Sequence, residues 1–437
     1  MKAVVLAGGE GIRLRPLTTD RAKALLPVLN RPLLDYVLHF LKSAGITEVI
    51  LVVDFFSDQL TEYAENLDLD LSVHIHRLDQ FRGTANILAD LKAQLTDPFV
   101  VMPADVLLDF PLETMVAACQ KDGTDLGMVI HPQLDRLGQI AFAYEGDQVI
   151  QVVPPQTQGA GYDTWVYYMT PRILELIDPG APMSIHPSLV EKVLDSPCKH
   201  RLFFATGFWT VVGRLLPYLE ANFCLLSSLK APEVVSPDVH IPASATLVGP
   251  YFIDQGVRLG EHVKVGPNVI LGPGVVLEND VHIDNAIVGA KTQIGKGSQL
   301  TACVVADHCH LNDGVRVDMF AVIGAHCTVG ARTVIKNASR IGPAVTIDSD
   351  QVVASTVRTP HAAPQPPSDL PSLDAQICAL MSQGGEWLLP ALAEALNTPV
   401  DALEPALDRL MAHSWVIRHR FNPPLYTLTP RYYSDNK

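Results

Sequence analysis

Several features that define secreted, membrane-spanning and nucleic-acid-binding proteins are scarce in this sequence. Its seven cysteines are scattered over 437 residues with no CxxC pair and no regular spacing, a pattern typical of reduced, buried thiols rather than of a disulfide framework. No stretch approaches the roughly 20 apolar residues that a membrane span needs. The formal net charge of −15 argues against a general nucleic-acid binder, although it permits phosphate ligands, which need only local cations.

A secretory signal pattern is also missing, because an apolar, strand-like run follows Met1 and Lys2 at once. We therefore expect a cytoplasmic protein. The chain of 437 residues, of which 48% are hydrophobic, is long enough for two or three domains with a large core.

The stretch that organises the chain is residues 3–28. An apolar run at residues 3–7 has the length and branching of a buried parallel strand. It leads into the glycine-rich residues 8–11, and Arg13, Arg15 and Lys23 follow. Glycines let successive backbone N–H groups approach a ligand, so a strand, a glycine-rich turn and then cations indicate a phosphate-binding loop. The glycines alone would also fit an ordinary tight turn between a strand and a helix.

The longer string GGEGIRLRPLT, with Lys23 after it, resembles the signature of the sugar-1-phosphate nucleotidyltransferases, in particular the mannose-1-phosphate guanylyltransferase branch. The resemblance implies that Arg13 and Lys23 are catalytic and neutralise charge as the α-phosphate of a nucleoside triphosphate is attacked. It implies that the loop wraps the nucleotide through Leu6, Ala7, Gly8, Gly9 and Gly11. The family usually has proline before this lysine, where this chain has Ala22.

Two further stretches resemble motifs of the same family. Residues 80–85 read QFRGTA, which by this match contact the nucleotide base through Gln80, Gly83 and Thr84; the alternative is an ordinary turn before a helix. Residues 99–105 read FVVMPAD, an apolar strand that ends in a carboxylate. By the match Asp105 is the Mg²⁺ ligand, since a carboxylate at a strand end can hold this metal against phosphate oxygens; the alternative is a turn or capping aspartate.

Strand-like and helix-like segments alternate through the first 105 residues. Helices are expected at 33–44, 57–66 and 86–95, and strands at 48–53 and 71–75. This order predicts an α/β, Rossmann-like nucleotidyltransferase domain over residues 1–230, with a parallel sheet covered on both faces. Ligands of such sheets lie at the carboxyl ends of the strands, where the loop at 8–11 falls.

The resemblance weakens in the half of this domain that should hold the sugar phosphate and the metal. Pro154 stands where the family has the lysine that grips the sugar phosphate, and Trp165 stands where a glycine lies against the sugar. Val211, in the string GFWTVVG, replaces the aspartate that is the second Mg²⁺ ligand. Valine offers the metal no oxygen. Asp163 and Glu191 are the carboxylates we considered as replacements.

Two functions therefore remain open. The chain is either an enzyme that makes an NDP-sugar from an NTP and a sugar 1-phosphate with Mg²⁺ and release of pyrophosphate, or a catalytically inactive relative. The inactive relative would bind a nucleotide or NDP-sugar and act as a regulatory or scaffold subunit. The feature that discriminates them is a second carboxylate facing Asp105.

From about residue 236 to 350 an aliphatic residue recurs every six positions, commonly followed by glycine, with one-residue slips before Val288 and Val305. This period predicts a parallel β-helix of hexapeptides, and it resembles the left-handed β-helix that follows the catalytic domain in many sugar nucleotidyltransferases. The resemblance implies a homo-oligomer formed through the β-helix. Histidine-dependent acyltransferases also use hexapeptides, but the five histidines here fall at exposed corner positions.

The remaining chain is expected to hold a Pro-rich linker at 351–371 and a winged-helix-like α+β module at 372–437, with three helices and a β-hairpin. DNA binding would be the obvious role of such a module. Its third helix, however, carries Asp401, Glu404 and Asp408 against Arg409 alone, which opposes phosphates. We favour a protein partner over nucleic acid, although Arg418, Arg420 and Arg431 make the hairpin basic.

Overall fold

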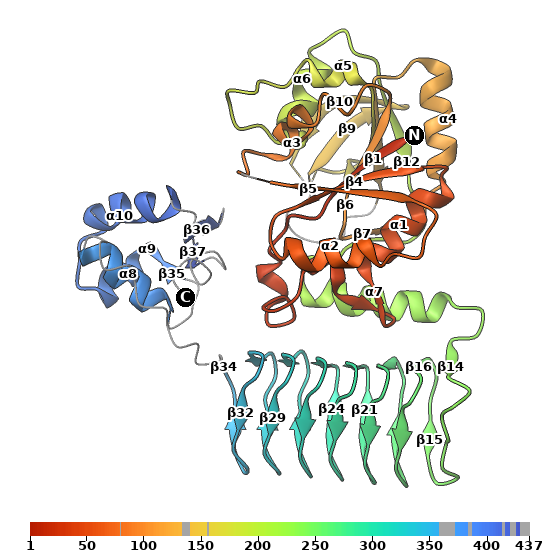
Figure 1. The fold of residues 1–437 in the computed structure, drawn as a ribbon, viewed down its shortest axis with the longest axis vertical. Coiled ribbons are helices and arrows are strands. Elements are labelled where there is room, and N and C mark those ends of the chain that lie inside the picture. The colour runs from red at the N-terminus through yellow and green to blue at the C-terminus, as the bar shows by residue number, and fades with distance from the viewer. Residues whose placement is uncertain are drawn as a thin grey trace. The chain divides into compact units, whose positions relative to one another are not determined.

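The structure is a computed structural model that describes residues 1–78, 80–132, 140–154, 157–357, 372–382, 387–412, 416–419 and 425–428. Its contacts divide the chain into two compact units, residues 1–355 and 356–437. The first unit contains a mixed sheet with helices and then a β-helix, and the second contains the C-terminal helices (Figure 1). Residues 358–371, which hold most of the expected Pro-rich linker, lie outside the described residues.

The central sheet of the first unit runs in the order β10-β9-β11-β6-β1-β4-β5, with β8 paired to β11 and β12 paired to β8. Its strands are β1 (Lys2–Leu6), β4 (Glu48–Val53), β5 (Ser72–Arg77), β6 (Phe99–Pro103), β8 (Leu126–His131), β9 (Ala141–Glu145), β10 (Gln148–Val153), β11 (Gly161–Met169) and β12 (His200–Phe204). Short ladders β2–β3 (Pro27–Val28, Arg31–Pro32) and β7–β13 (Val106–Leu108, Trp209–Val211) lie beside it.

Helices cover both faces of this sheet, as the alternation of side chains along β1 requires. Ala3 and Val5 pack in one buried cluster with α1, α2 and α4, whereas Val4 packs in the other cluster with α3, α5 and α6. The helices are α1 (Leu33–Ser43), α2 (Ser57–Glu65), α3 (Thr84–Asp90), α4 (Leu112–Asp122), α5 (Pro171–Leu174), α6 (Val190–Leu194) and α7 (Leu215–Ser228), with short turns η1 (Ile12–Leu14), η2 (Lys23–Leu25) and η3 (Ile185–Leu189).

The α/β domain is confirmed, but the expectation of a wholly parallel sheet is wrong. The strands β6, β1, β4 and β5 are parallel to one another. β11 runs antiparallel to β6, β8 and β9, and β9 forms a hairpin with β10. The hairpin turns at Gly146, whose φ of 61° suits glycine. A hairpin reverses the chain without a helix, which the helix–strand alternation of the first 105 residues could not reveal.

The β-helix predicted from the six-residue period is confirmed, and within the described residues its strands form three parallel sheets. The first holds β14 (Glu233–Val235), β16 (Tyr251–Ile253), β19 (Val269–Leu271), β22 (Ile287–Val288), β25 (Val304–Val305), β28 (Val322–Ile323) and β31 (Arg340–Ile341). The second holds β15 (Thr246–Leu247), β18 (Lys264–Val265), β21 (His282–Asp284), β24 (Gln299–Thr301), β27 (Arg316–Val317), β30 (Val334–Ile335) and β33 (Val352–Val353). The third holds β17 (Arg258–Leu259), β20 (Val276–Leu277), β23 (Gln293–Ile294), β26 (His310–Leu311), β29 (Thr328–Val329) and β32 (Thr346–Ile347).

The two slips of the repeat are shortened corners. Leu271 pairs with Val288 and Val288 with Val305, a spacing of 17 residues, whereas Val305 pairs with Ile323, a spacing of 18. Every aliphatic hexad position from Leu271 to Ile347 is buried. The repeat therefore places one inward aliphatic side chain on each strand, and a corner can lose a residue without breaking the stack.

One sheet of the β-helix packs against the N-terminal part of the same unit. Ile270, Ile287, Val304 and Val322 point outward from this sheet and are buried in one cluster with side chains of α7 and of residues 14–33. The outward residues of the second sheet are polar instead, for example Lys264 and Arg316. The apolar ladder therefore marks the face on which α7 lies, as Figure 1 shows.

The second unit has helices α8 (Ser372–Ser382), α9 (Leu389–Ala395) and α10 (Val400–Ala412), and a small sheet in the order β35-β37-β36. The strands are β35 (Trp387–Leu388), β36 (Val416–His419) and β37 (Leu425–Leu428), and β34 (Thr356–Val357) precedes the linker. Residues 387–388 form a short strand directly before α9. Arg409 makes a two-point ion pair with the buried carboxylate of Asp374.

None of the helices in the described segments has both the length and the apolar character needed to cross a membrane.

The corner glycines of the β-helix give a sharp test of the fold. A Cβ at Gly295 would lie 2.5 Å from the carbonyl carbon of Asn312 in the next coil, whereas Gly297 has φ 68° and open space around it. We predict that Gly295→Ala lowers the free energy of unfolding by about 2 kcal/mol or more, because the coils must separate. Gly297→Asn should cost less than about 1 kcal/mol, since asparagine tolerates this conformation.

Urea denaturation followed by circular dichroism would measure both variants. Equal stability of Gly295→Ala and the wild-type protein would contradict the close stacking of these coils.

Candidate functional site

The candidate site lies at the carboxyl ends of β1, β4 and β6, as the sequence predicted. Leu6 is paired with Val52 on one side and with Pro103 on the other. The next residue, Ala7, donates its N–H to the carbonyl of Val52 at 2.8 Å, and Ala104 donates to the carbonyl of Leu6 at 3.0 Å. The glycine-rich loop and Asp105 therefore leave the sheet at the same edge.

The loop after β1 uses its glycines in different ways. Gly11 has φ 71°, and its carbonyl accepts a hydrogen bond from the Thr18 hydroxyl at 2.8 Å, which closes the loop. A Cβ at Gly8 would lie 3.2 Å from the Cβ of Asp54, while Gly9 has open space around it. The backbone at Gly9 is therefore open to a ligand, as a phosphate-binding loop requires.

A cluster of cations surrounds Asp105. Lys23, on η2, forms an ion pair with Asp105. The backbone of Gly213 passes close to both catalytic candidates, because a Cβ there would lie 3.4 Å from Nη2 of Arg13 and 3.8 Å from Nζ of Lys23. Gly213 is followed by Arg214 at the start of α7. The structure thus brings together Arg13, Lys23 and Asp105, as predicted, and adds Arg214.

The charges of this cluster do not balance. Partial burial of its guanidinium and the positive charge of Arg214 lower the pKa of Arg13, and Asp105 offsets part of that effect. Lys23 is paired with Asp105, but neither arginine makes an ion pair or hydrogen bond with any described residue. Three cations against one carboxylate leave an excess of two positive charges, which favours an anion carrying several charges.

An apolar ladder lies at the position where the family resemblance implies an aspartate. Val211 pairs with Val106 in the β13–β7 ladder, and the next residue, Val212, donates its N–H to the carbonyl of Asp105 at 2.8 Å. Val211 therefore lies directly beside the segment that carries Asp105, where an aspartate would have added a second carboxylate.

Of the two carboxylates considered as replacements, Glu191 is exposed on α6 and Asp163 is engaged in other contacts. Asp163 is fully buried and accepts hydrogen bonds from the Tyr167 hydroxyl and, at 2.9 Å, from the N–H of Trp165. Burial raises the pKa of Asp163 to about 7 despite these two bonds. Trp165 has φ 67°, which explains why a glycine suits this position. Its indole lies 6.3 Å, between ring centres, from His186, a buried histidine whose ring nitrogens have no partner in the described structure.

The motif at 80–85 begins close to the glycine-rich loop. Leu78, two residues before the motif, lies so near Gly8 that a Cβ built on this glycine would contact its side chain. Gln80 is exposed there. Gly83 and Thr84 instead contact another segment: a Cβ at Gly83 would lie 2.2 Å from the carbonyl oxygen of Met183, and the Thr84 hydroxyl accepts the N–H of Ile185 at 2.8 Å. Their part in base binding stays a prediction.

Comparison with known proteins agrees with this geometry. The family model described as nucleotidyl transferase matches residues 2–228, and the model described as GMPPB C-terminal domain matches residues 247–351. The chain belongs to the nucleotidyl transferase family.

Several mannose-1-phosphate guanylyltransferases are similar to this chain. Mannose-1-phosphate guanylyltransferase 1 of Arabidopsis thaliana is 25% identical over 378 residues, which cover 83% of this chain and 96% of the plant protein. Mannose-1-phosphate guanyltransferase of Schizosaccharomyces pombe is 27% identical over 273 residues, or 60% of this chain and 74% of the yeast protein. Mannose-1-phosphate guanyltransferase beta-A of Xenopus laevis is 28% identical over 279 residues, which cover 60% of this chain and 74% of the frog protein.

The nucleotidyl transferase site does not offer the donor set of a two-carboxylate Mg²⁺ site. No three His, Cys, Asp or Glu side chains converge on a metal position anywhere in the described ranges. Asp105 is already paired with Lys23, and Val211 offers no oxygen. Mg²⁺ prefers hard oxygen ligands, so the side chains present do not fit the metal site that the family resemblance implied.

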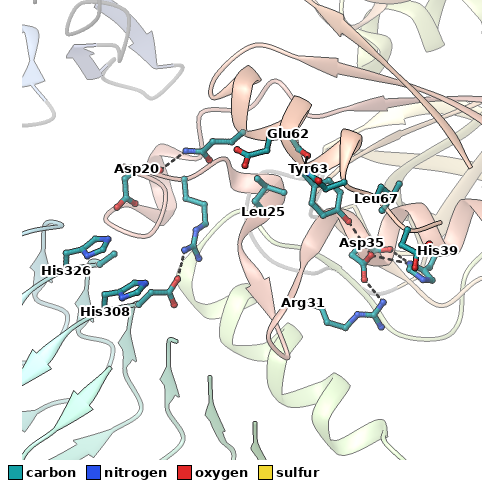
Figure 2. A pocket seen from close by; sticks show the side chains of 16 residues that line it. Asp20, Leu25, Arg31, Asp35, His39, Glu62, Tyr63, Leu67, His308 and His326 are labelled. Atoms are coloured by element: carbon teal, nitrogen blue, oxygen red, sulfur yellow. Dashed lines mark hydrogen bonds and ion pairs between the residues drawn. The ribbon is translucent and has the colours of Figure 1, made fainter. Parts of the chain in front are cut away.

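A cavity lies elsewhere in this unit, between its N-terminal part and the β-helix (Figure 2). It has a volume of about 900 Å³ and is lined by residues that include Asp20, Arg21, Glu62, His308 and His326. Arg13, Lys23 and Asp105 do not line it. A smaller apolar cavity of about 380 Å³ lies between α1, β7 and α7. The candidate site at the edge of the sheet is thus separate from both of these cavities.

Arg214 and Glu10 are the site residues that sequence reasoning missed. Arg214 directly follows the GFWTVVG string, so its place beside that motif was the available signal. Glu10 lies within the glycine-rich loop, is buried, and forms an ion pair with Arg15. Burial raises the pKa of Glu10 to about 7; Arg15 opposes this shift and Asp54 adds to it.

Glu10 generates a prediction about stability and pH. Because its pKa in the folded protein lies above the usual 4.5, its contribution to stability is fully present below pH 4.5 and is lost as the pH rises through about 7. Glu10→Gln removes this dependence, so its free energy of unfolding relative to wild type should rise over that interval, by up to about 3 kcal/mol.

Urea denaturation at a series of pH values measures this difference, and exposed Glu145→Gln serves as the control. A difference between wild type and Glu10→Gln that stays constant from pH 4.5 to 8 would rule out a titrating Glu10.

Proposed function

We propose that this protein binds a nucleotide or NDP-sugar and acts as a regulatory or scaffold member of the nucleotidyl transferase family, without efficient nucleotidyl transfer. The observation that carries this proposal is the pairing at the metal position. Asp105 pairs with Lys23, and Val211 occupies the neighbouring strand where a second carboxylate would stand. Phosphoryl transfer depends on positioning and neutralisation of charge, so the loss of a metal ligand weakens the reaction directly.

Binding of the phosphates remains well supported. The unpaired guanidinium groups of Arg13 and Arg214 lie near the open backbone at Gly9 and leave this edge of the sheet positively charged. A triphosphate or diphosphate would satisfy these groups without a metal, since arginine can bind phosphate through two parallel hydrogen bonds. The base would lie toward Gln80, Gly83 and Thr84.

The alternative function is the complete enzyme reaction, NTP plus sugar 1-phosphate to NDP-sugar plus pyrophosphate. One observation favours it: Arg13, Lys23 and Asp105 lie together, as the family's catalytic residues should. In that case Asp105 would be the residue that holds Mg²⁺, and the metal would supply charge neutralisation at the attacked phosphate.

Two partner surfaces accompany the proposal. Homo-oligomerisation would use the β-helix, where Met319 and Phe320 are exposed at a corner. A protein partner would use the C-terminal unit, because Arg409 of α10 is tied to Asp374 while Asp401 and Glu404 stay exposed. That acidic surface opposes nucleic acid. Arg420 and Arg431 lie outside the described residues.

The cation cluster predicts binding of polyphosphates. Wild-type protein should bind GTP, GDP-mannose or inorganic tripolyphosphate in calorimetry, and Lys23→Ala should weaken that binding by about tenfold or more. Lys2→Ala is the matched control, since Lys2 makes an exposed ion pair with Glu48 at the opposite end of β1. The same samples, given Mg²⁺, an NTP and a sugar 1-phosphate, should release no pyrophosphate. Release that Asp105→Ala abolishes would establish the enzyme instead.

Another prediction concerns the metal. Wild-type affinity for GTP should change less than about threefold between EDTA and Mg²⁺, because cations rather than a metal hold the phosphates. Val211→Asp adds a carboxylate next to the Asp105 segment and should make GTP binding at least about tenfold tighter with Mg²⁺ than with EDTA. Val211→Asn, of the same size but neutral, controls for shape. Strong Mg²⁺ dependence of wild type would overturn the metal-free site.

A further inference from the structure

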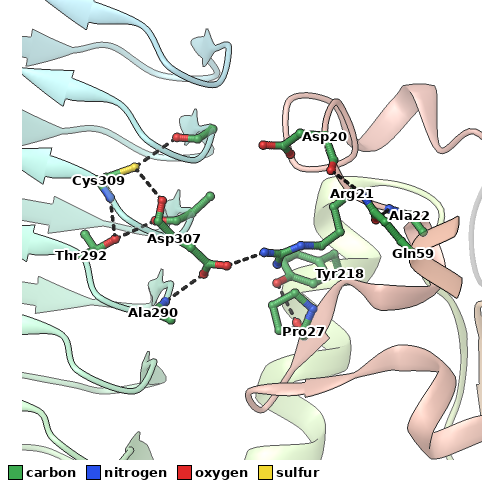
Figure 3. Close-up of polar contacts among 12 residues, drawn as sticks. Asp20, Arg21, Ala22, Pro27, Gln59, Tyr218, Ala290, Thr292, Asp307 and Cys309 are labelled. Atoms are coloured by element: carbon green, nitrogen blue, oxygen red, sulfur yellow. Dashed lines mark hydrogen bonds and ion pairs between the residues drawn. The ribbon is translucent and has the colours of Figure 1, made fainter. Parts of the chain in front are cut away.

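The segment that carries Lys23 is held from outside its own secondary structure. Gln59, on α2, accepts the N–H of Ala22 at 2.9 Å and donates to the carbonyl of Asp20 at 2.8 Å (Figure 3). This one side chain thus spans the backbone on both sides of Arg21. Its two bonds fix the chain immediately before η2, from which Lys23 reaches Asp105.

Between these two bonds, Arg21 turns toward the β-helix and forms an ion pair with Asp307 (Figure 3). The partners are 286 residues apart in sequence. Burial alone would lower the pKa of Arg21, but Asp307 outweighs it and the pKa is raised. Most of both side chains is covered, with exposed fractions of 33% and 17%. Burial strengthens a paired charge and makes the loss of one partner costly.

Asp307 is itself fixed in the β-helix. Its Oδ1 accepts the N–H of Ala290, in the preceding coil, at 2.8 Å. A Cβ at Gly289 would lie 2.3 Å from the same Oδ1, so the glycine leaves the space that the carboxylate fills. The carboxylate therefore cannot follow Arg21 if the loop shifts, and it acts as a fixed anchor.

We propose that Arg21 and Asp307 are positioning residues through which the β-helix holds Lys23 at the phosphate site. The proposal rests on the proposed binding of phosphates at Arg13, Lys23 and Arg214. Neither residue of the pair belongs to that cation cluster. The pair acts by restricting the backbone at 20–23, and a fixed supporting contact of this kind reduces the ordering that a ligand must impose.

The direction in which Asp307→Asn changes anion affinity distinguishes positioning from a simple effect of charge. Asp307→Asn removes a negative charge from the protein, which by charge alone should leave anion binding unchanged or strengthen it. Loss of positioning should weaken it instead. We expect Asp307→Asn to weaken tripolyphosphate binding by about threefold or more. Tripolyphosphate is the probe because it contacts cations and no base or sugar site.

Asp254→Asn is the matched control. Asp254 also lies in the β-helix and accepts a hydrogen bond from Nδ2 of Asn30 at 2.9 Å, but it forms no hydrogen bond or ion pair with residues 20–23. Its removal changes the net charge equally. Affinity of Asp254→Asn within about twofold of wild type is expected. Gln59→Ala, which changes no charge, should weaken tripolyphosphate binding as Asp307→Asn does, whereas Arg21→Lys should retain more affinity than Arg21→Gln.

Amide hydrogen exchange on the full chain keeps the test independent of binding. Asp307→Asn should speed exchange at residues 20–26 and leave α3 unchanged, with melting temperatures used to confirm that both Asn variants are folded. Unchanged exchange at 20–26, or tripolyphosphate binding as tight as wild type, overturns the positioning role. If wild type itself binds no tripolyphosphate, the proposed function fails, while faster exchange would still support the anchor.

Discussion

The ion pair between Lys23 and Asp105 is the contact on which the site depends. It joins the loop after β1 to the end of β6, which are 82 residues apart in the chain. Around it, Arg13 and Arg214 have no carboxylate of their own among the described residues. Like charges brought together raise the free energy of the empty site. The site is therefore built for a ligand that supplies negative charge, and an additional metal cation would add to the excess rather than relieve it.

The parts of this site that the sequence could predict are local or periodic. The loop at 8–11 and Asp105 follow apolar strands whose order along the chain places their ends at one edge. The β-helix follows from a six-residue period that survives two shortened corners. Trp165 was matched to a position that the family fills with glycine. Its φ of 67° supports this match, because glycine adopts such a conformation readily and tryptophan rarely does.

What the sequence could not predict is set by contacts between distant segments. Arg214 becomes part of the site only because β13 pairs with β7 and brings Gly213 beside Arg13. Arg21 and Asp307 carry no pattern that links them across 286 residues. The antiparallel β11 was missed because a strand's direction is fixed by its neighbours and not by its own composition. The match of Gly83 and Thr84 to a base-binding motif likewise gave no hint of their contacts with Met183 and Ile185.

The β-helix then acquires a role beyond that of an added domain. A cation cluster without its ligand repels itself, so something else must hold the cations in place. Two features supply that support. The outward side chains of Ile270, Ile287 and Val304 pack against α7, whose N-terminal cap is Arg214. Asp307 anchors the segment of Lys23 through its ion pair with Arg21. Both cationic segments thus contact the β-helix, one through the outward face of β19, β22 and β25 and the other through the turn that follows β25. By reciprocity, a ligand that orders the cations also strengthens that contact, and whatever binds the β-helix there alters the affinity of the cations. This linkage is what a regulatory member of the family would need, and it requires no catalysis.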